Sequence, residues 1–223
     1  MKTVVGRDRL QFEYFNAVSY RVATDPVSVA YASPKVEFAF RAMSLPQEPK
    51  MLDLACGNGI FTHQLSGVPG LTVGIDLSTH LLAQNGHRNR VCGDAHTLPF
   101  GDRSFDLVFE ANLLHHVPDP AAVIAEMQRV SRDYVVLVEP NRWNPLMLAF
   151  SLLVPAERGV LSSSARRLRQ LVQGSSLRFV DCMTTGMISQ NNTPAFLVPL
   201  LKKFDRPIWW GEYVVLIARK QPC

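Results

Sequence analysis

The sequence predicts an α/β protein with a mostly parallel sheet, and three observations support this prediction. Short apolar segments rich in valine, leucine and isoleucine alternate with segments whose apolar residues recur at helical spacing. Aspartates stand at the ends of several of the apolar segments. A turn with two glycines separates the first apolar segment from the first helical one. Repeated strand–helix–strand order favours parallel strands covered by helices on both faces.

Seven segments have the apolar character of strands. They are Lys50–Ala55, Leu71–Asp76, Arg90–Cys92, Phe105–Glu110, Tyr134–Glu139, Leu177–Thr184 and Glu212–Arg219. The segments expected to be helical are Ile60–Leu65, Thr79–Asn85, Ala121–Val130 and Ala195–Phe204, with further helical patches over residues 8–44. No crossover of the earlier type precedes the last strand, so we expect an antiparallel final pair.

The composition is that of a globular protein that fits one domain. Of the 223 residues, 47% are hydrophobic and 19% are charged. No apolar run reaches the roughly 18 residues of a membrane-spanning helix, and the first residues lack the pattern of a secretory signal. The four cysteines show neither CxxC spacing nor a Cys/His cluster, which predicts free thiols and no metal. We therefore expect a cytoplasmic protein.

The charges are unevenly distributed, although the net charge is only +4. Residues 1–141 hold 12 Lys and Arg against 15 Asp and Glu, whereas residues 142–223 hold 11 against 4. A basic C-terminal third could favour an anionic substrate or an acidic membrane surface. A solvated basic face explains the same asymmetry more simply.

The stretch LDLACGNGIF, residues 52–61, reads as a buried strand, a tight turn and the start of a helix. Gly57 and Gly59 allow backbone to approach a ligand, and the N–H groups of the following helix suit an anion. On this loop alone a dinucleotide site and an adenosyl site are both open. Thr62 stands where the third glycine of a dinucleotide fingerprint would be. Asp53 would repel a pyrophosphate, but it would favour an ammonium group.

Two further carboxylates follow the next two strands. Asp76 comes 17 residues after Gly59, where a carboxylate can accept hydrogen bonds from ribose hydroxyls. Asp94 comes 18 residues later, where a carboxylate and the next N–H can contact an adenine edge. Three acids at successive strand ends suit an ammonium, a ribose and an adenine within one molecule. S-adenosylmethionine carries all three.

Four ordered motifs over roughly residues 48–141 carry a family resemblance: LDLACGNG, GIDLS, GDAHTLPFGDRSFDLVFEANLLHHVPDP and VVLVEPN. The sequence resembles the class I S-adenosylmethionine-dependent methyltransferases, in the small-molecule branch near the ubiquinone and menaquinone biosynthesis type. The resemblance implies a Rossmann-like, doubly wound, seven-stranded sheet with an antiparallel last strand. One departure is Ser131-Arg132-Asp133, which replaces the usual proline-glycine-glycine turn before the fifth strand.

The resemblance also implies S-adenosyl-L-methionine as cofactor and a set of residues that bind it. These are Asp53, Ala55, Cys56, Gly57, Asn58, Gly59, Asp76, Leu77, Asp94, Ala95 and Glu110. Methyl transfer chiefly needs alignment and exclusion of water, and a general base helps only a protonated nucleophile. His115 is the preferred candidate for that base and His116 the second, although either could have a structural role at the entry to a helix.

The single domain is expected to divide into a helical cap (residues 1–47), a cofactor-binding half (48–141) and an acceptor or lid half (142–223). The segment NRWNPLMLAFSLLVPAERG is unusually apolar, and ARRLRQLV follows it. This suits a small acceptor that is apolar or amphipathic. An alternative is that the apolar helix only packs on the sheet, and a weak peripheral membrane contact is a further one.

Other functions remain alternatives at this point. An RNA- or protein-directed methyltransferase would share the fold, but no Asn-Pro-Pro-Tyr-like motif follows the fourth strand, so no nucleic-acid partner is expected. A catalytically silent S-adenosylmethionine-binding module is another. Asp53 and Thr62 disfavour an NAD-dependent oxidoreductase. Glu110 stands where a metal-dependent enzyme of the catechol type would need an aspartate, so no metal is expected.

Overall fold

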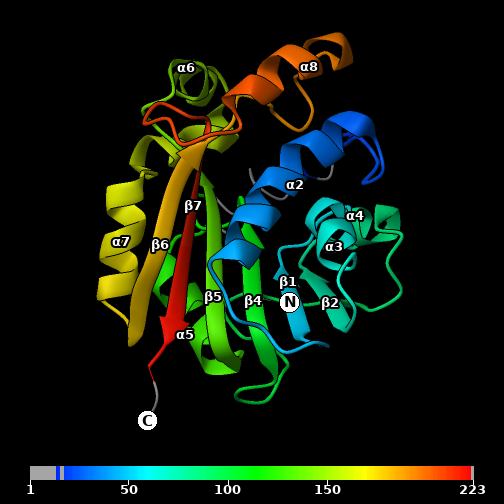
Figure 1. The fold of residues 1–223 in the computed structure, drawn as a ribbon, viewed down its shortest axis with the longest axis vertical. Helices are drawn as coiled ribbons and strands as arrows, with labels where there is room; N and C mark the ends of the chain where they lie inside the picture. Colours follow the sequence, from blue (N-terminus) through cyan, green and yellow to red (C-terminus); the bar gives the residue numbers. More distant parts are fainter. Residues whose placement is uncertain (1–13, 16–17, 222–223) are drawn as a thin grey trace.

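The computed structural model describes residues 14–15 and 18–221, which form one seven-stranded sheet with helices on both faces (Figure 1). The strand order is β3-β2-β1-β4-β5-β7-β6. The pairs from β3 to β5 are parallel, and β7 is antiparallel to both β5 and β6. The predicted doubly wound sheet with an antiparallel last strand is therefore confirmed.

The strands match the predicted segments to within three residues at either end. They are β1 (Lys50–Leu54), β2 (Leu71–Asp76), β3 (Arg90–Cys92), β4 (Phe105–Ala111), β5 (Ser131–Pro140), β6 (Leu177–Thr185) and β7 (Tyr213–Lys220). The helices are α2 (Pro26–Arg41), α3 (Ile60–Leu65), α4 (Thr79–Gln84), α5 (Pro120–Val130), α6 (Pro145–Leu153), α7 (Ala165–Gln173) and α8 (Val198–Leu201). Three short 3₁₀ helices cover Pro155–Ser162, Ala195–Leu197 and Lys202–Phe204.

The segment that replaces the family's usual turn is itself part of a strand, because β5 begins at Ser131, three residues before the predicted start at Tyr134. Ser131 pairs with Phe105, and a bulge separates this pair from the regular register of β4 and β5. The Ser131 hydroxyl donates to the Tyr134 carbonyl at 2.9 Å, so a buried polar side chain is satisfied within the bulge. Arg132 pairs with Asp106 at 2.5 Å. A polar segment can thus form a strand when side chains of the neighbouring strand pair with its charged groups.

Two other expectations changed in detail. The helix expected over Ala195–Phe204 is divided into a 3₁₀ turn, the single-turn α8 and a second 3₁₀ turn. Pro199 lies within it and lacks the N–H that a regular helix needs. Of the helical patches expected over residues 8–44, α2 is a continuous helix, and residues 1–13 and 16–17 lie outside the described residues.

Alternate residues of the central strands pack into two separate cores. Leu107 and Phe109 of β4 face the core beneath α2 and α3, where Tyr31 and Phe61 lie. Val108 faces the opposite core, which α5 and α7 cover. This two-sided burial explains why the central strands are almost continuously apolar. Among the described residues, no helix has both the length and the apolar content needed to cross a membrane.

Candidate active site

A cavity of about 680 Å³ opens at the carboxyl ends of β1, β2 and β4. Nine of the eleven residues predicted to bind a cofactor line it. They are Asp53, Ala55, Cys56, Gly57, Asn58, Asp76, Leu77, Asp94 and Ala95. Gly59 and Glu110, the other two, lie outside the lining. Parallel strands end at the same edge of a sheet, and this brings together residues from segments far apart in the sequence.

The glycine turn after β1 forms one wall of the cavity. Gly57 and Gly59 have φ angles of +50° and +91°, in the left-handed region that favours glycine. The Gly57 N–H donates to Oδ2 of Asp76 at 2.8 Å, which ties the turn to the end of β2. A Cβ on Gly59 would lie 2.4 Å from Oδ1 of Asn85, whereas a Cβ on Gly57 would meet only Leu81, at 3.8 Å. The missing Cβ of Gly59 therefore leaves room for the side chain of Asn85, whereas Gly57 is suited to its position by its left-handed backbone angle.

Two non-glycine residues beside the cavity also have left-handed backbone. Ala55 follows β1 with φ of 59°, and Asn112 follows the neighbouring β4 with φ of 58°. Such conformations cost about 1–3 kcal/mol and concentrate at functional sites. Asn112 is held in place because its N–H donates to Val138 and its Nδ2 donates to the Tyr31 hydroxyl at 2.8 Å. The fold therefore imposes these angles at the cavity.

Asp53 lies at the buried base of the cavity and is only 1% exposed. Burial raises the pKa of Asp53 to about 7, while the Thr62 hydroxyl, which donates to Oδ2 at 2.6 Å, acts against this shift. A nearby cation would favour the charged form. Thr62, which replaces the third glycine of a dinucleotide fingerprint, thus holds Asp53 in place through this hydrogen bond. The carboxylate of Asp53 can then bind an ammonium group.

Asp76 and Asp94 differ in how firmly they are held. Oδ2 and Oδ1 of Asp76 accept the N–H groups of Gly57 and Ser78 at 2.8 and 2.7 Å. Burial raises the pKa of Asp76, and these backbone bonds oppose the shift. Each carboxylate oxygen can accept a second hydrogen bond, so Asp76 can still bind hydroxyls. Asp94 is half exposed and closes a turn in which Oδ1 accepts the His96 N–H at 2.9 Å.

Behind the cavity, Glu139 of β5 holds the loop that follows β4. Its Oε1 accepts the N–H groups of Leu113 and Leu114 at 2.8 Å, and its Oε2 lies 2.6 Å from Nδ1 of His115. Burial opposes a charge on His115, but Glu139 and then Glu157 outweigh it and raise the pKa of His115 to about 9. His115, the preferred catalytic candidate from the sequence, is buried and does not line the cavity.

Glu110 lies in the same buried cluster. Burial, followed by the adjacent Glu139, raises the pKa of Glu110 well above its usual range. Two neighbouring carboxylates in a core are stable only when one of them keeps its proton. Oε2 of Glu110 lies 3.3 Å from the Leu113 nitrogen. The structure thus places Glu110 beneath the loop, although the resemblance implied a contact with the cofactor.

His116 lines the cavity, in contrast to His115. Its Nε2 lies 3.9 Å from Oε2 of Glu157, and the ring of Phe15 packs edge-on against it with 4.9 Å between centroids. Oε2 of Glu157 also lies 3.5 Å from Nε2 of His115. One ligand atom from each of these three residues lies within 4.8 Å of the others, so the cluster has the composition of a metal site.

Several lining residues come from outside the predicted set. They are Phe15 and Tyr20 of the N-terminal segment, Ile60 and Phe61 of α3, His116, and Gln190 after β6. Glu157 stands behind them, 41 residues beyond His116. Ile60 and Phe61 end the stretch LDLACGNGIF, and His116 was the second candidate base, whereas only the expected lid pointed to Phe15, Tyr20 and Gln190.

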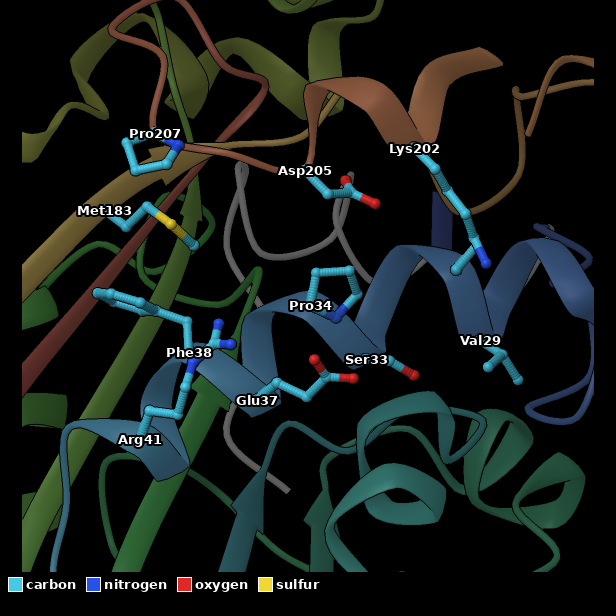
Figure 2. A pocket seen from close by; sticks show the side chains of 11 residues that line it. Val29, Ser33, Pro34, Glu37, Phe38, Arg41, Met183, Lys202, Asp205 and Pro207 are labelled. Carbon is cyan, nitrogen blue, oxygen red and sulfur yellow. The ribbon is translucent and has the colours of Figure 1, made fainter. Parts of the chain in front are cut away.

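A second cavity, of about 540 Å³, lies between α2 and the segment after α8 (Figure 2). Glu37 and Arg41 face it from α2, and Lys202 and Asp205 face it from the C-terminal segment. It contains none of the residues predicted from the sequence. The larger cavity is therefore the candidate active site.

Comparison with known proteins identifies the part of the chain that surrounds this cavity. Residues 52–138 match the methyltransferase domain family. The chain is 40% identical over 93 residues to a demethylmenaquinone methyltransferase of Mycolicibacterium vanbaalenii, which is 41% of each protein. It is 35% identical over 134 residues to a demethylmenaquinone methyltransferase of Corynebacterium urealyticum, 56% of this chain and 58% of that protein. The matches thus span about half the length of these relatives.

Solved structures extend the likeness of the fold beyond the matched segment. An S-adenosylmethionine-dependent methyltransferase of Thermotoga maritima has a TM-score of 0.66 at 20% identity, covering 87% of this chain and 91% of that one. One from Aquifex aeolicus has a TM-score of 0.61 at 14% identity, covering 97% and 100%. Residues 52–138 therefore match a methyltransferase domain, as the motifs indicated, and the solved structures show that the fold is shared.

The two glycines of the turn predict different costs of substitution. Gly59→Ala should lower the free energy of unfolding more than Gly57→Ala does, because only the former drives a Cβ into buried Asn85. Both variants carry the penalty of left-handed backbone, about 1–2 kcal/mol. Urea titration followed by circular dichroism measures the difference. Equal losses in the two variants would contradict the proposed role of Gly59.

The pair formed by Glu139 and His115 predicts a dependence of stability on pH. The pKa of His115 is raised in the folded state to about 9, so the stabilisation is complete below its unfolded value of 6.5 and is lost as pH rises through about 9. In Glu139→Gln this loss should be smaller. Because other buried groups titrate in both proteins, the quantity to compare is the difference between the two curves of unfolding free energy from pH 6 to 9. Parallel curves would show that Glu139 does not set this pKa.

Proposed function

We propose that the chain is an S-adenosylmethionine-dependent methyltransferase that acts on a small acceptor of apolar or amphipathic character. The observation that carries the proposal is the convergence of Asp53, Asp76 and Asp94 on one cavity at three neighbouring strand ends. The match of the surrounding residues to a methyltransferase domain supports it. When bound, the cofactor supplies a methyl group that is already activated by the sulfonium.

Each acid has a distinct part in binding. Buried Asp53 pairs with the ammonium, because a nearby cation favours the charged carboxylate and so offsets the burial that raises its pKa. Asp76 accepts the ribose hydroxyls with the lone pairs that Gly57 and Ser78 leave available. Asp94 and the following N–H lie at the adenine end, at the more exposed rim.

The acceptor enters between the N-terminal segment and the C-terminal half. Asn58 of the glycine turn donates to the Arg21 carbonyl at 2.8 Å, and the Arg21 N–H donates to Oδ1 of Asn191 at 3.2 Å. This chain of contacts places both ends of the sequence over the cofactor loop. Aromatic Phe15 and Tyr20 line the cavity there. An apolar ring of the quinone class, as in the name of the relatives, suits this lining.

His116 is the residue positioned to take a proton from the acceptor. It lines the cavity, and Glu157 approaches its Nε2 from the other half of the chain. His115 lies behind and stays paired with Glu139, so it positions the loop and does not react. We therefore prefer His116 to His115 as the candidate base, because only His116 lines the cavity. Protons shared between the histidines and the carboxylates Glu139 and Glu157 account for the pairing in this cluster. We therefore propose that it works without a metal.

The ribose assignment predicts the effect of removing one carboxylate. Asp76→Ala should weaken binding of S-adenosylhomocysteine by about 1.5–3 kcal/mol, the range for hydrogen bonds to a charged group. Isothermal calorimetry measures the change, with thermal unfolding as a check that the glycine turn survives. Glu48→Ala, which removes an exposed carboxylate outside the cavity, is the control. NAD should not bind wild-type protein. Normal affinity in a folded Asp76 variant would refute the assignment.

The role of His116 predicts a separation of catalysis from binding. With a short-chain demethylmenaquinone analogue as acceptor, His116→Asn should lower turnover by about 100- to 10,000-fold, the typical contribution of a general base. Affinity for S-adenosylhomocysteine should remain that of the wild type. His115→Asn should instead lose thermal stability, because it removes the partner of buried Glu139.

Two results would contradict this role. One is a His116 variant whose rate falls with an unchanged pH profile, which indicates positioning alone. The other is loss of activity on treatment with a chelator and its recovery with a divalent cation, which would make the His115, His116 and Glu157 cluster a metal centre.

A further inference from the structure

We infer that one end of the molecule is a docking surface for an anionic lipid bilayer. This apolar end surface is formed by exposed side chains of two segments of the C-terminal half. They are Trp143, Leu146, Leu148, Leu152 and Leu153 around α6, and Phe196, Leu200 and Trp209 around α8. The inference rests on the proposed function in one respect, that the acceptor is apolar and enters at this end.

The exposure of these side chains is far greater than packing on the sheet would leave. Leu153 is 81% exposed, Phe196 80% and Trp209 77%. Scattered apolar residues are common on protein surfaces, but a group of large ones marks an interaction site. Of the large apolar side chains recorded as exposed, most belong to these two segments. The alternative that the apolar helix only packs on the sheet is therefore wrong for its outer face.

The two segments are linked into one surface by a third. Nδ2 of Asn144, the N-cap of α6, donates to the Trp210 carbonyl at 2.9 Å. The ring of Trp210 packs against Phe204, which follows α8, with 6.0 Å between centroids. In Figure 1, α6 and α8 lie at the same end of the molecule, beyond the end at which β5 terminates. The candidate active site opens at the carboxyl ends of the parallel strands, on that same side.

The exposed charges of the two segments that form the surface have one sign. The exposed charged residues of segments 142–160 and 187–212 are all basic: Arg142, Arg158, Lys202, Lys203 and Arg206. The carboxylates of these segments are withdrawn. Glu157 faces the two histidines, and Asp205 and Glu212 lie near the buried Lys35. Anionic lipid headgroups complement this arrangement.

The side-chain types favour a bilayer over another protein. Tryptophan is enriched where a protein meets the headgroup region, and leucine and phenylalanine insert below it while lysine and arginine remain at the headgroups. Docking at this end would place the entrance of the cavity next to the phase in which an apolar acceptor dissolves. Residence on the bilayer would thus deliver the acceptor without transfer through water.

Vesicle binding tests the inference without methyl transfer or cofactor. The three tryptophans of the chain, Trp143, Trp209 and Trp210, all lie in or next to the apolar end surface, so their fluorescence reports on it directly. Vesicles of phosphatidylcholine with phosphatidylglycerol should shift their emission to shorter wavelength and bring the protein to the top in flotation. Pure phosphatidylcholine should bind more weakly, and added salt should reduce the difference.

Two double variants separate the contribution of the apolar side chains to vesicle binding from that of the basic side chains. Leu152→Gln with Leu153→Gln should weaken binding roughly tenfold or more, because two apolar side chains no longer insert. Lys202→Gln with Lys203→Gln should weaken it roughly tenfold on anionic vesicles only. The control is Arg88→Gln with Arg103→Gln, which removes two exposed charges before β3 and β4, at the opposite end of the sheet.

Three outcomes would overturn the inference. They are no flotation with anionic vesicles, equal loss in the control variant, and a stable dimer in sedimentation whose formation the leucine variant abolishes in the absence of lipid. The last would assign the surface to a second copy of the chain. Cofactor binding is measured separately, so failure of vesicle binding leaves the proposed methyl transfer standing, and failure of cofactor binding leaves the membrane surface standing.

Discussion

A single buried carboxylate, Glu139, sets the geometry on which the candidate site depends. It lies at the end of β5, is 1% exposed, and accepts hydrogen bonds from two successive backbone N–H groups of the loop after β4. A charge in this position is stable only if every lone pair finds a donor, and the loop supplies them. His115 provides a further partner at 2.6 Å. The loop is thereby fixed, and His116, the next residue, is directed to the cavity.

Interactions between charged side chains also connect the two halves of the chain. Glu157, from the half that follows β5, approaches both His115 and His116, which follow β4. Buried Lys35 of α2 lies over the rings of Tyr31 and Tyr213, at 3.9 and 4.5 Å from their centroids. Burial lowers the pKa of Lys35 to about 8, and Glu212 opposes the shift. These contacts hold the N-terminal helix and the last strand in a fixed relation to the cavity.

The C-terminal half and the glycine turn differ in what holds them, which is side-chain pairing in the first and backbone geometry in the second. Glu157, Asp205 and Glu212 of the C-terminal half face buried partners, which leaves the exposed charges of segments 142–160 and 187–212 basic and the outer face of α6 apolar. The glycine turn after β1, in contrast, is held by backbone geometry, with left-handed angles at Ala55, Gly57 and Gly59. Backbone angles thus shape the glycine turn, whereas pairing of buried side chains determines the charge of the C-terminal segments.

The sequence by itself determined the order of the strands and helices, the glycine turn and the acids at three strand ends, because each is a local signal of periodicity, turn chemistry or position after a strand. Only the tertiary structure decided which of two adjacent histidines faces the cavity. It also decided that Glu110 lies beneath the loop, and that Ser131 begins a strand. These depend on Glu139, Glu157 and Asp106, whose contacts lie 24 or more residues away in the sequence. Burial and charge pairing between distant segments set them, and no local pattern records which segments will meet.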